Sequence, residues 1–148
     1  MKSFRTLALG LVFILLASSC ATPGYMIEES NYSVKQHRIA ITAALGLVRQ
    51  VSQNGRVVLS LYHDKNLKNI EVTPKTRERY FTRVTVLGAI RPYRVQVEVI
   101  QEKRDPDTKE FMPVGLDEEL AEKRAMVVQN MLNQSRDEGR TFDEESPF

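Results

Sequence analysis

Two neighbouring stretches of alternating residues constrain the fold of this chain more than any other feature. The first stretch covers residues 79–87, the second covers residues 93–99, and residues 88–92 between them contain Gly and Pro. In both stretches, every second position holds an uncharged, mostly apolar residue. These positions are Tyr80, Thr82, Val84, Val86, Tyr93, Val95, Val97 and Val99. A period of two with one apolar side is typical of an antiparallel sheet with one dry and one solvated face.

Amphipathic segments on both sides of these stretches predict two helices. Ser33 and Gln36 fit a capping box, and apolar residues then recur at helical spacing as far as Asn54-Gly55. We therefore expect the first helix over residues 34–53. Asp117 is a favourable N-cap for a second helix, whose apolar stripe fades by Ser135.

Two further segments predict additional strands. Residues 56–62 are rich in β-branched side chains and follow a Gly turn. Residues 110–114 contain Pro113, which suits an edge strand because proline has no amide hydrogen to donate. The expected class is α+β: an antiparallel sheet of three or four strands with both helices packed on one face, in the order α-β-β-β-(β)-α.

The N-terminal segment has the three parts of a secretory signal. Lys2 and Arg5 are followed by an apolar run over residues 7–16 and by the small residues 17–19. An apolar run of this length is too short for a membrane-spanning helix, which needs about 20 residues. We therefore interpret residues 1–19 as a signal peptide.

Ala17-Ser18-Ser19-Cys20 resembles a bacterial lipobox, the cleavage site of lipoprotein signal peptides, and Cys20 is the single cysteine of the chain. The resemblance implies that the Cys20 thiol receives a diacylglycerol and its amine a further acyl chain after cleavage. Two or more acyl chains anchor a protein stably. Ala21, not Asp, follows, which in enterobacterial lipoproteins implies export to the outer membrane. The alternative is a free cysteine near an ordinary cleavage site.

The mature chain is expected to hold one domain, over residues 33–135. Residues 20–32 lack a clear period and contain Pro23-Gly24, so they are interpreted as a lipidated tether. Residues 136–148 are polar and acidic, and a disordered tail is expected there.

The net charge of +2 conceals an uneven distribution. Residues 20–104 hold fourteen basic and seven acidic side chains, whereas residues 105–148 hold five and twelve. Arg79, Arg83, Arg91 and Arg94 lie in the densest basic stretch and form a candidate surface for an anionic partner. The alternative is internal compensation, with the acidic C-terminal part lying over a solvated basic face. The small total charge gives no indication of nucleic-acid binding.

No catalytic or metal-binding pattern stands out. His37 lies near the apolar stripe of the first helix and is interpreted as a packing residue, and His63-Asp64 as a turn after a strand. No nucleophile elbow accompanies them. The acids near Asp105 lack the central Gly of a calcium loop. We therefore expect no enzyme activity, no cofactor and no metal site.

The segment around Arg124 (residues 120–128, followed by Leu132) resembles the helix of OmpA-like peptidoglycan-binding domains, in which Leu-Ser-x-x-Arg-Ala-x-x-Val recurs. The resemblance implies that Arg124 contacts the peptide stem of peptidoglycan. The upstream Thr-Asp partner of that family is absent from this sequence, and the match covers about a dozen residues.

The sequence therefore predicts a lipoprotein held through Cys20 in the outer membrane and facing the periplasm. Its expected role is that of a non-enzymatic accessory or scaffold subunit of a cell-envelope complex, with an envelope protein as partner. The alternative is a ligand-binding module for peptidoglycan or anionic lipid.

Overall fold

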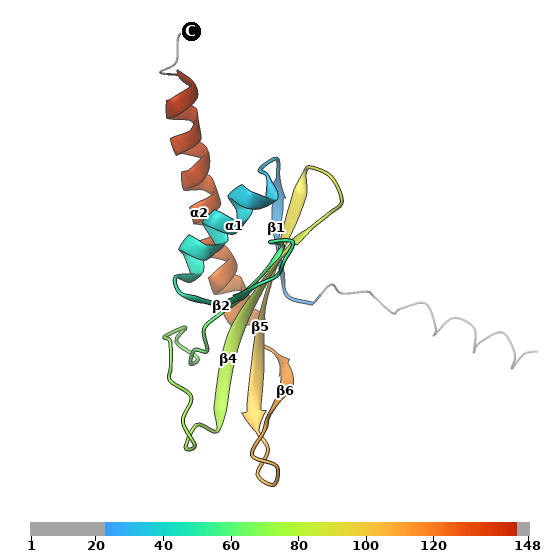
Figure 1. The fold of residues 1–148 in the computed structure, drawn as a ribbon, viewed down its shortest axis with the longest axis vertical. Helices are drawn as coiled ribbons and strands as arrows, with labels where there is room; N and C mark the ends of the chain where they lie inside the picture. The colour runs from blue at the N-terminus through green and yellow to red at the C-terminus, as the bar shows by residue number, and fades with distance from the viewer. Residues whose placement is uncertain (1–22, 145–148) are drawn as a thin grey trace, which may run out of the picture.

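A computed structural model of the chain describes residues 23–144, which form one six-stranded antiparallel sheet and two helices (Figure 1). In chain order the elements are β1 (Tyr25–Ser30), α1 (Val34–Leu45), β2 (Val48–Val51), β3 (Val57–Ser60), β4 (Glu78–Leu87), β5 (Tyr93–Arg104), β6 (Phe111–Leu116) and α2 (Glu118–Glu144). The predicted α+β class, with both helices on one face of an antiparallel sheet, is confirmed.

The predicted hairpin forms the centre of the sheet. β4 and β5 pair over ten consecutive positions, from Glu78 opposite Lys103 to Leu87 opposite Arg94. β3 and then β2 follow on the far side of β4. Two strands pair with the edge of β5 that faces away from β4. β1 pairs with the first half of β5, and β6 pairs with the second half.

The main core lies between the helices and the apolar side of this hairpin. α2 packs on β5 and β1, α1 packs on β3 and β4, and the two helices contact each other. The largest fully buried apolar side chains of this cluster are Ile41, Val58, Val84, Val95, Val97 and Val128. Each such side chain contributes roughly 1.5–3 kcal/mol through its removal from water. The dry face predicted from the alternation is therefore the face that the helices cover.

The first helix ends eight residues earlier than predicted. Its capping box is present, since Gln36 N donates to Ser33 Oγ and Ser33 N donates to Gln36 Oε1. Gly46 ends the helix at φ 73°, and its N–H bonds to Thr42 O. Asn54-Gly55 lies instead in the turn between β2 and β3. The residues after Gly46 form strand β2 and not a continuation of the helix, because they pair with β3.

The tether predicted at residues 20–32 contains strand β1, so the domain begins earlier than expected. Tyr25 and Ile27 pair with Val97 and Val95 of β5, and Ile27 is part of the main core. With β2, this strand raises the count to six, against the three or four predicted. β1 and β2 are both short. β1 pairs with a strand far away in the sequence, and both pairings contain a register shift. Local periodicity in the sequence does not detect such strands.

The second helix begins as predicted and ends later. Asp117 Oδ1 accepts a hydrogen bond from Leu120 N, and Glu118 and Glu119 occupy the first turn. The helix continues to Glu144, so the expected disordered tail is helical through that residue. A helix satisfies its backbone hydrogen bonds locally, so a polar sequence can extend it beyond the apolar stripe. Residues 145–148 lie outside the described part of the chain.

Candidate functional site

The candidate site is the face of the sheet that neither α1 nor α2 covers, called here the helix-free face. On β4 and β5 its side chains alternate with those of the core. They are Arg79, Phe81, Arg83, Thr85, Leu87, Arg94, Gln96, Glu98, Ile100, Glu102 and Arg104. Three of the four arginines predicted to form a basic surface lie on this face, and Arg91 lies in the turn at its end.

Two of the predicted arginines pair with glutamates directly opposite them on β5. Arg79 Nε lies 2.6 Å from Glu102 Oε2, and Arg83 Nε lies 2.7 Å from Glu98 Oε2. The hydrogen bond that Arg83 donates to Glu98 raises the pKa of Arg83 above its ordinary value. Charge-assisted pairs of this kind are strongest where water is partly excluded, as it is here. These pairs neutralise part of the face.

Arg91 and Arg94 are exposed, and neither takes part in an ion pair between described side chains. The alternative in which the acidic C-terminal part covers the basic face is wrong, because α2 packs on the opposite side of the sheet. The compensating charges are Glu98 and Glu102 of the neighbouring strand. These glutamates lie opposite Arg79 and Arg83 because β4 and β5 pair with each other.

Arginine and aromatic side chains alternate across the helix-free face. The guanidinium of Arg79 lies 3.7 Å from the ring centroid of Tyr62 and 3.9 Å from that of Phe111. Arg49 lies over Tyr62 and Phe81, and Arg104 lies over Phe111. Such contacts contribute about 0.5–2 kcal/mol each, depending on exposure. This arginine–aromatic ladder connects β2, β4, β5 and β6, and it lies toward the end of the face where β4 begins and β5 ends.

Two hollows open beside the ladder. One is lined by Phe81, Arg83, Ile100, Glu102, Pro113, Gly115 and Leu116. The other lies between the β5–β6 turn and the loop before β4, where Lys75, Arg77, Arg104 and Lys109 face a single acid, Asp105. Arg104 donates to Thr73 O at 3.0 Å, and its Nε is buried without a partner. Both hollows combine basic groups with apolar surface.

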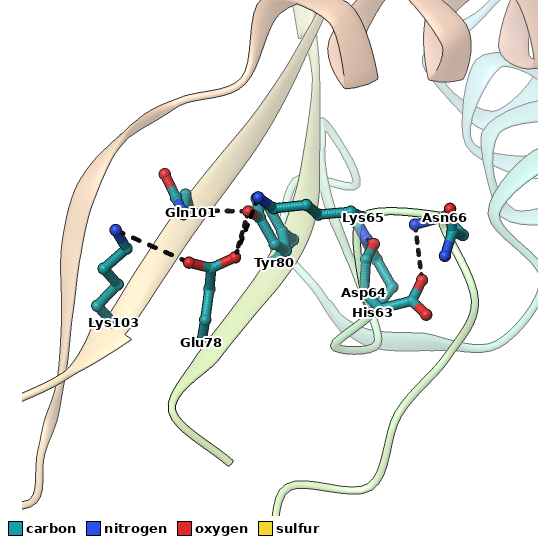
Figure 2. A network of polar contacts seen from close by, with 8 residues as sticks. All are labelled: His63, Asp64, Lys65, Asn66, Glu78, Tyr80, Gln101 and Lys103. Carbon is teal, nitrogen blue, oxygen red and sulfur yellow. Dashed lines mark hydrogen bonds and ion pairs between the residues drawn. The ribbon is translucent and has the colours of Figure 1, made fainter.

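A second polar network lies at the end of the core face (Figure 2). The Tyr80 hydroxyl donates to Glu78 Oε1 at 2.6 Å and accepts from Gln101 Nε2 at 3.1 Å. Lys65 and Lys103 each lie 3.8 Å from the Glu78 carboxylate. The hydrogen bond from Tyr80 holds the pKa of Glu78 below its usual range, while burial raises the pKa of Tyr80. This network connects β4 and β5 to the loop that follows β3.

His63 is fully buried and serves the fold. Its Nδ1 donates to Asp64 O at 2.9 Å, so Nε2 accepts from the Thr82 hydroxyl at 3.2 Å in the neutral ring. Burial lowers the pKa of His63, which favours this neutral form. Ser60 is also buried, and its hydroxyl donates to Leu61 O and accepts from Thr82 N. These residues connect the end of β3 to β4.

His37 is also fully buried, on α1 between the rings of Tyr32 and Tyr93. Its Nδ1 donates to Ser33 O at 3.0 Å, and its Nε2 is buried with no hydrogen-bond partner. Protonation of Nε2 would place an unsatisfied donor in the core, and burial accordingly lowers the pKa of His37. Both histidines therefore occupy positions that favour packing over proton transfer.

Arg124 is 9% exposed and lies in α2 against the loop that follows β3. Its Nη2 donates to Leu67 O at 3.3 Å, its Nε is buried without a partner, and burial lowers its pKa. Arg124 thus holds this loop against α2. The predicted contact with peptidoglycan would require the loop to move.

Cys20 lies outside the described residues. Within residues 23–144, no three His, Cys, Asp or Glu side chains are grouped as a metal site. The described helices include none with the length and apolarity needed to cross a membrane. Sequence reasoning missed Arg49, Tyr62, Arg104 and Phe111, whose contacts join distant parts of the chain.

Comparisons with protein-family models, with curated proteins and with solved structures found no match to this chain.

Proposed function

We propose that this protein is a lipoprotein of the outer membrane, anchored through Cys20 and facing the periplasm, and that it is a non-enzymatic accessory or scaffold subunit of a cell-envelope complex. The lipobox-like leader supports the anchor. The accessory role rests on one structural observation, the groove between β1 and α2.

The groove joins an open strand edge to a helix surface. β1 is the terminal strand of the sheet path and pairs with β5 along one side only. Residues of both elements line the groove, namely Tyr25, Met26, Ile27, Ala125, Met126, Gln129, Asn130 and Asn133. An open strand edge beside a helix can accept an extended peptide as an added strand, with backbone hydrogen bonds supplying affinity and side-chain pockets supplying specificity. The groove therefore suits an extended segment of a partner protein.

A matched pair of substitutions tests this role. Met126 on α2 is 54% exposed and lines the groove, whereas Ile39 on α1 is 57% exposed and does not. Met126→Arg should abolish recovery of a specific complex from cells solubilised in mild detergent, and Ile39→Arg should leave it intact. Equal recovery of the complex with both variants, or no complex with the wild type, would contradict the proposal.

The helix-free face favours anionic lipid as the second candidate function, since Arg94 is exposed on it and lies outside any ion pair between described side chains. Arginine binds phosphate oxygens well because its planar guanidinium presents several donors at once.

No comparable observation favours the peptidoglycan alternative. A cell-wall pull-down that retains the wild type but loses Arg124→Ala would support it.

A further inference from the structure

The described chain starts on the helix-free face of the sheet. Gln96 Nε2 donates to Pro23 O at 2.5 Å. Gly24 has φ 85°, and a Cβ there would lie 2.5 Å from Val97 O and 2.6 Å from Cγ of Glu98. Gln96 and Glu98 alternate with the buried Val95 and Val97, so both point away from the helices. Pro23 and Gly24 are therefore held at the edge of β5, beside the helix-free face.

The remaining distance to the anchor is short. Ala21 and Thr22 alone separate Cys20 from Pro23. A fully extended chain advances at most about 3.5 Å per residue, so Cys20 lies within about 10 Å of Pro23. This step depends on the proposed acylation of Cys20. Given that acylation, the membrane surface must lie close to the edge of the helix-free face.

The charges of the two sides of the molecule favour one orientation. On β2, β4 and β5, the described side chains of the helix-free face include Arg49, Arg79, Arg83, Arg94 and Arg104 against Glu98 and Glu102. The aromatic rings of the ladder lie among these arginines, and aromatic and basic side chains are enriched at the headgroup level of membranes. On the other side, the exposed Glu118, Glu119 and Glu122 of α2 are offset by the exposed cations Lys35, Arg38 and Lys123. An anionic surface therefore attracts the first side more strongly than the second.

We infer that the helix-free face is the membrane-facing side of the protein, and that it rests on anionic phospholipid headgroups next to the acylated Cys20. Arg94 supplies the principal headgroup contact because it lies on this face and no acid among the described side chains pairs with it. The groove between β1 and α2 stays open to the periplasm in this orientation, since it lies on the helix side of the β1 edge.

The orientation is tested with site-specific fluorescent labels on the full-length, lipidated protein. Acylation occupies the Cys20 thiol, so one introduced cysteine can be labelled selectively. Thr85→Cys places the label on the helix-free face and Met126→Cys places it on α2. The protein is reconstituted into vesicles of phosphatidylcholine with phosphatidylglycerol. A lipid-borne quencher should reduce the Thr85 signal several-fold more than the Met126 signal, and an aqueous quencher should show the opposite order.

Charge variants with matched controls test the headgroup contacts. Arg94→Gln removes an exposed cation from the proposed membrane side, and Lys35→Gln removes one from an exposed position on α1. The first variant should reduce lipid quenching at Thr85 several-fold, and the second should not. Equal quenching at Thr85 and Met126, or no dependence on phosphatidylglycerol, would overturn the inference. Shielding of Thr85 in native membranes but not in lipid vesicles would assign the face to a protein partner and also overturn it.

Vesicle flotation and the mass of the protein separate this inference from the proposed anchor. A protein that floats with acylated Cys20 but shows equal quenching at both labels refutes the orientation alone. A protein with unmodified Cys20 that does not float refutes the anchor, and the orientation with it.

Discussion

Arg83 and Glu98 face each other across β4 and β5, with the guanidinium Nε 2.7 Å from the carboxylate Oε2. The side chain of Glu98 is 6% exposed, whereas that of Arg83 is 44% exposed. The carboxylate is thus the member that depends on the pair, because a buried charge without a partner is costly. The basic segment of the sequence therefore contains two kinds of arginine. Some pair with a glutamate of the neighbouring strand, and others lie outside any ion pair between described side chains.

Replacing Arg83 with glutamine should destabilise the fold by about 2 kcal/mol, because it leaves the Glu98 carboxylate buried without its partner. Arg83→Gln/Glu98→Gln should recover most of this loss. Arg94→Gln, on the same strand pair but outside any described ion pair, should change stability by less than about 0.5 kcal/mol. Urea unfolding measures all three variants, and a loss in Arg94→Gln as large as that in Arg83→Gln would contradict the assignment.

Gly24 should be the least replaceable of the glycines with positive φ. Gly24→Ala would bring a Cβ to 2.5 Å from the backbone oxygen of Val97, so β1 must shift from β5. Gly46 also has a positive φ but has nothing within 4 Å of an added Cβ, so Gly46→Ala should cost only the conformational strain of about 1 kcal/mol. Hydrogen exchange of the β1 amides should accelerate in Gly24→Ala and not in Gly46→Ala.

Stability should fall as the pH drops below about 6.5, the ordinary histidine pKa. Burial lowers the pKa of both His37 and His63 in the folded protein, so below that pH the unfolded chain binds more protons than the folded one. Each histidine contributes at most about 1.4 kcal/mol per pH unit to this loss. His37→Phe, which keeps an aromatic ring between Tyr32 and Tyr93, should make the slope shallower. Denaturation at pH 7.5 and 5.5 gives the comparison, and an unchanged slope would be inconsistent with a buried neutral His37.

The Tyr80 hydroxyl should control the titration of Glu78. Its hydrogen bond is the largest cause of the lowered Glu78 pKa, ahead of the charges of Lys65 and Lys103. Tyr80→Phe should raise that pKa toward the usual carboxyl value and cost about 1 kcal/mol of stability. Lys65→Gln should move the pKa less. An NMR titration of the Glu78 side chain distinguishes the two variants, and a larger shift in Lys65→Gln would show that charge dominates.

Cys20→Ser should release the protein from the membrane, because the variant lacks the thiol that would carry the diacylglycerol. The mass of the mature protein and its flotation with membranes are the measurements. A variant that still carried lipid and floated would contradict anchoring at this residue.

Part of the site was accessible from the sequence. Strands joined through the turn at residues 88–92 place Arg79 opposite Glu102 and Arg83 opposite Glu98, because pairing proceeds one residue at a time on each side of the turn. The alternation also indicated which side chains share the solvated face. The expectation of a basic surface lacked this step, and the alternative of internal compensation assigned the compensating acids to the C-terminal part of the chain.

The limits of local patterns are clear at β1 and β2. Residues 48–51 carry spacing that suits a helix, yet Gly46 ends α1 and the next residues pair with β3. Residues 25–30 lack a strong period, yet β5 and α2 supply partners for both their backbone and Ile27. Tertiary contacts override weak local preferences in short strands because pairing and burial provide most of their stability.

The sequence by itself determined the α+β class, the central hairpin, the capped starts of both helices and the pattern that predicts the lipid anchor. These features depend on periodicity, capping and spacing within short stretches of chain. Only the tertiary structure decided that Arg79 lies between Tyr62 and Phe111, that Arg124 is buried under a loop, and that Pro23 joins the helix-free face. Those contacts join segments far apart in the chain, and their partners become neighbours only when the sheet has formed and the helices cover its other face.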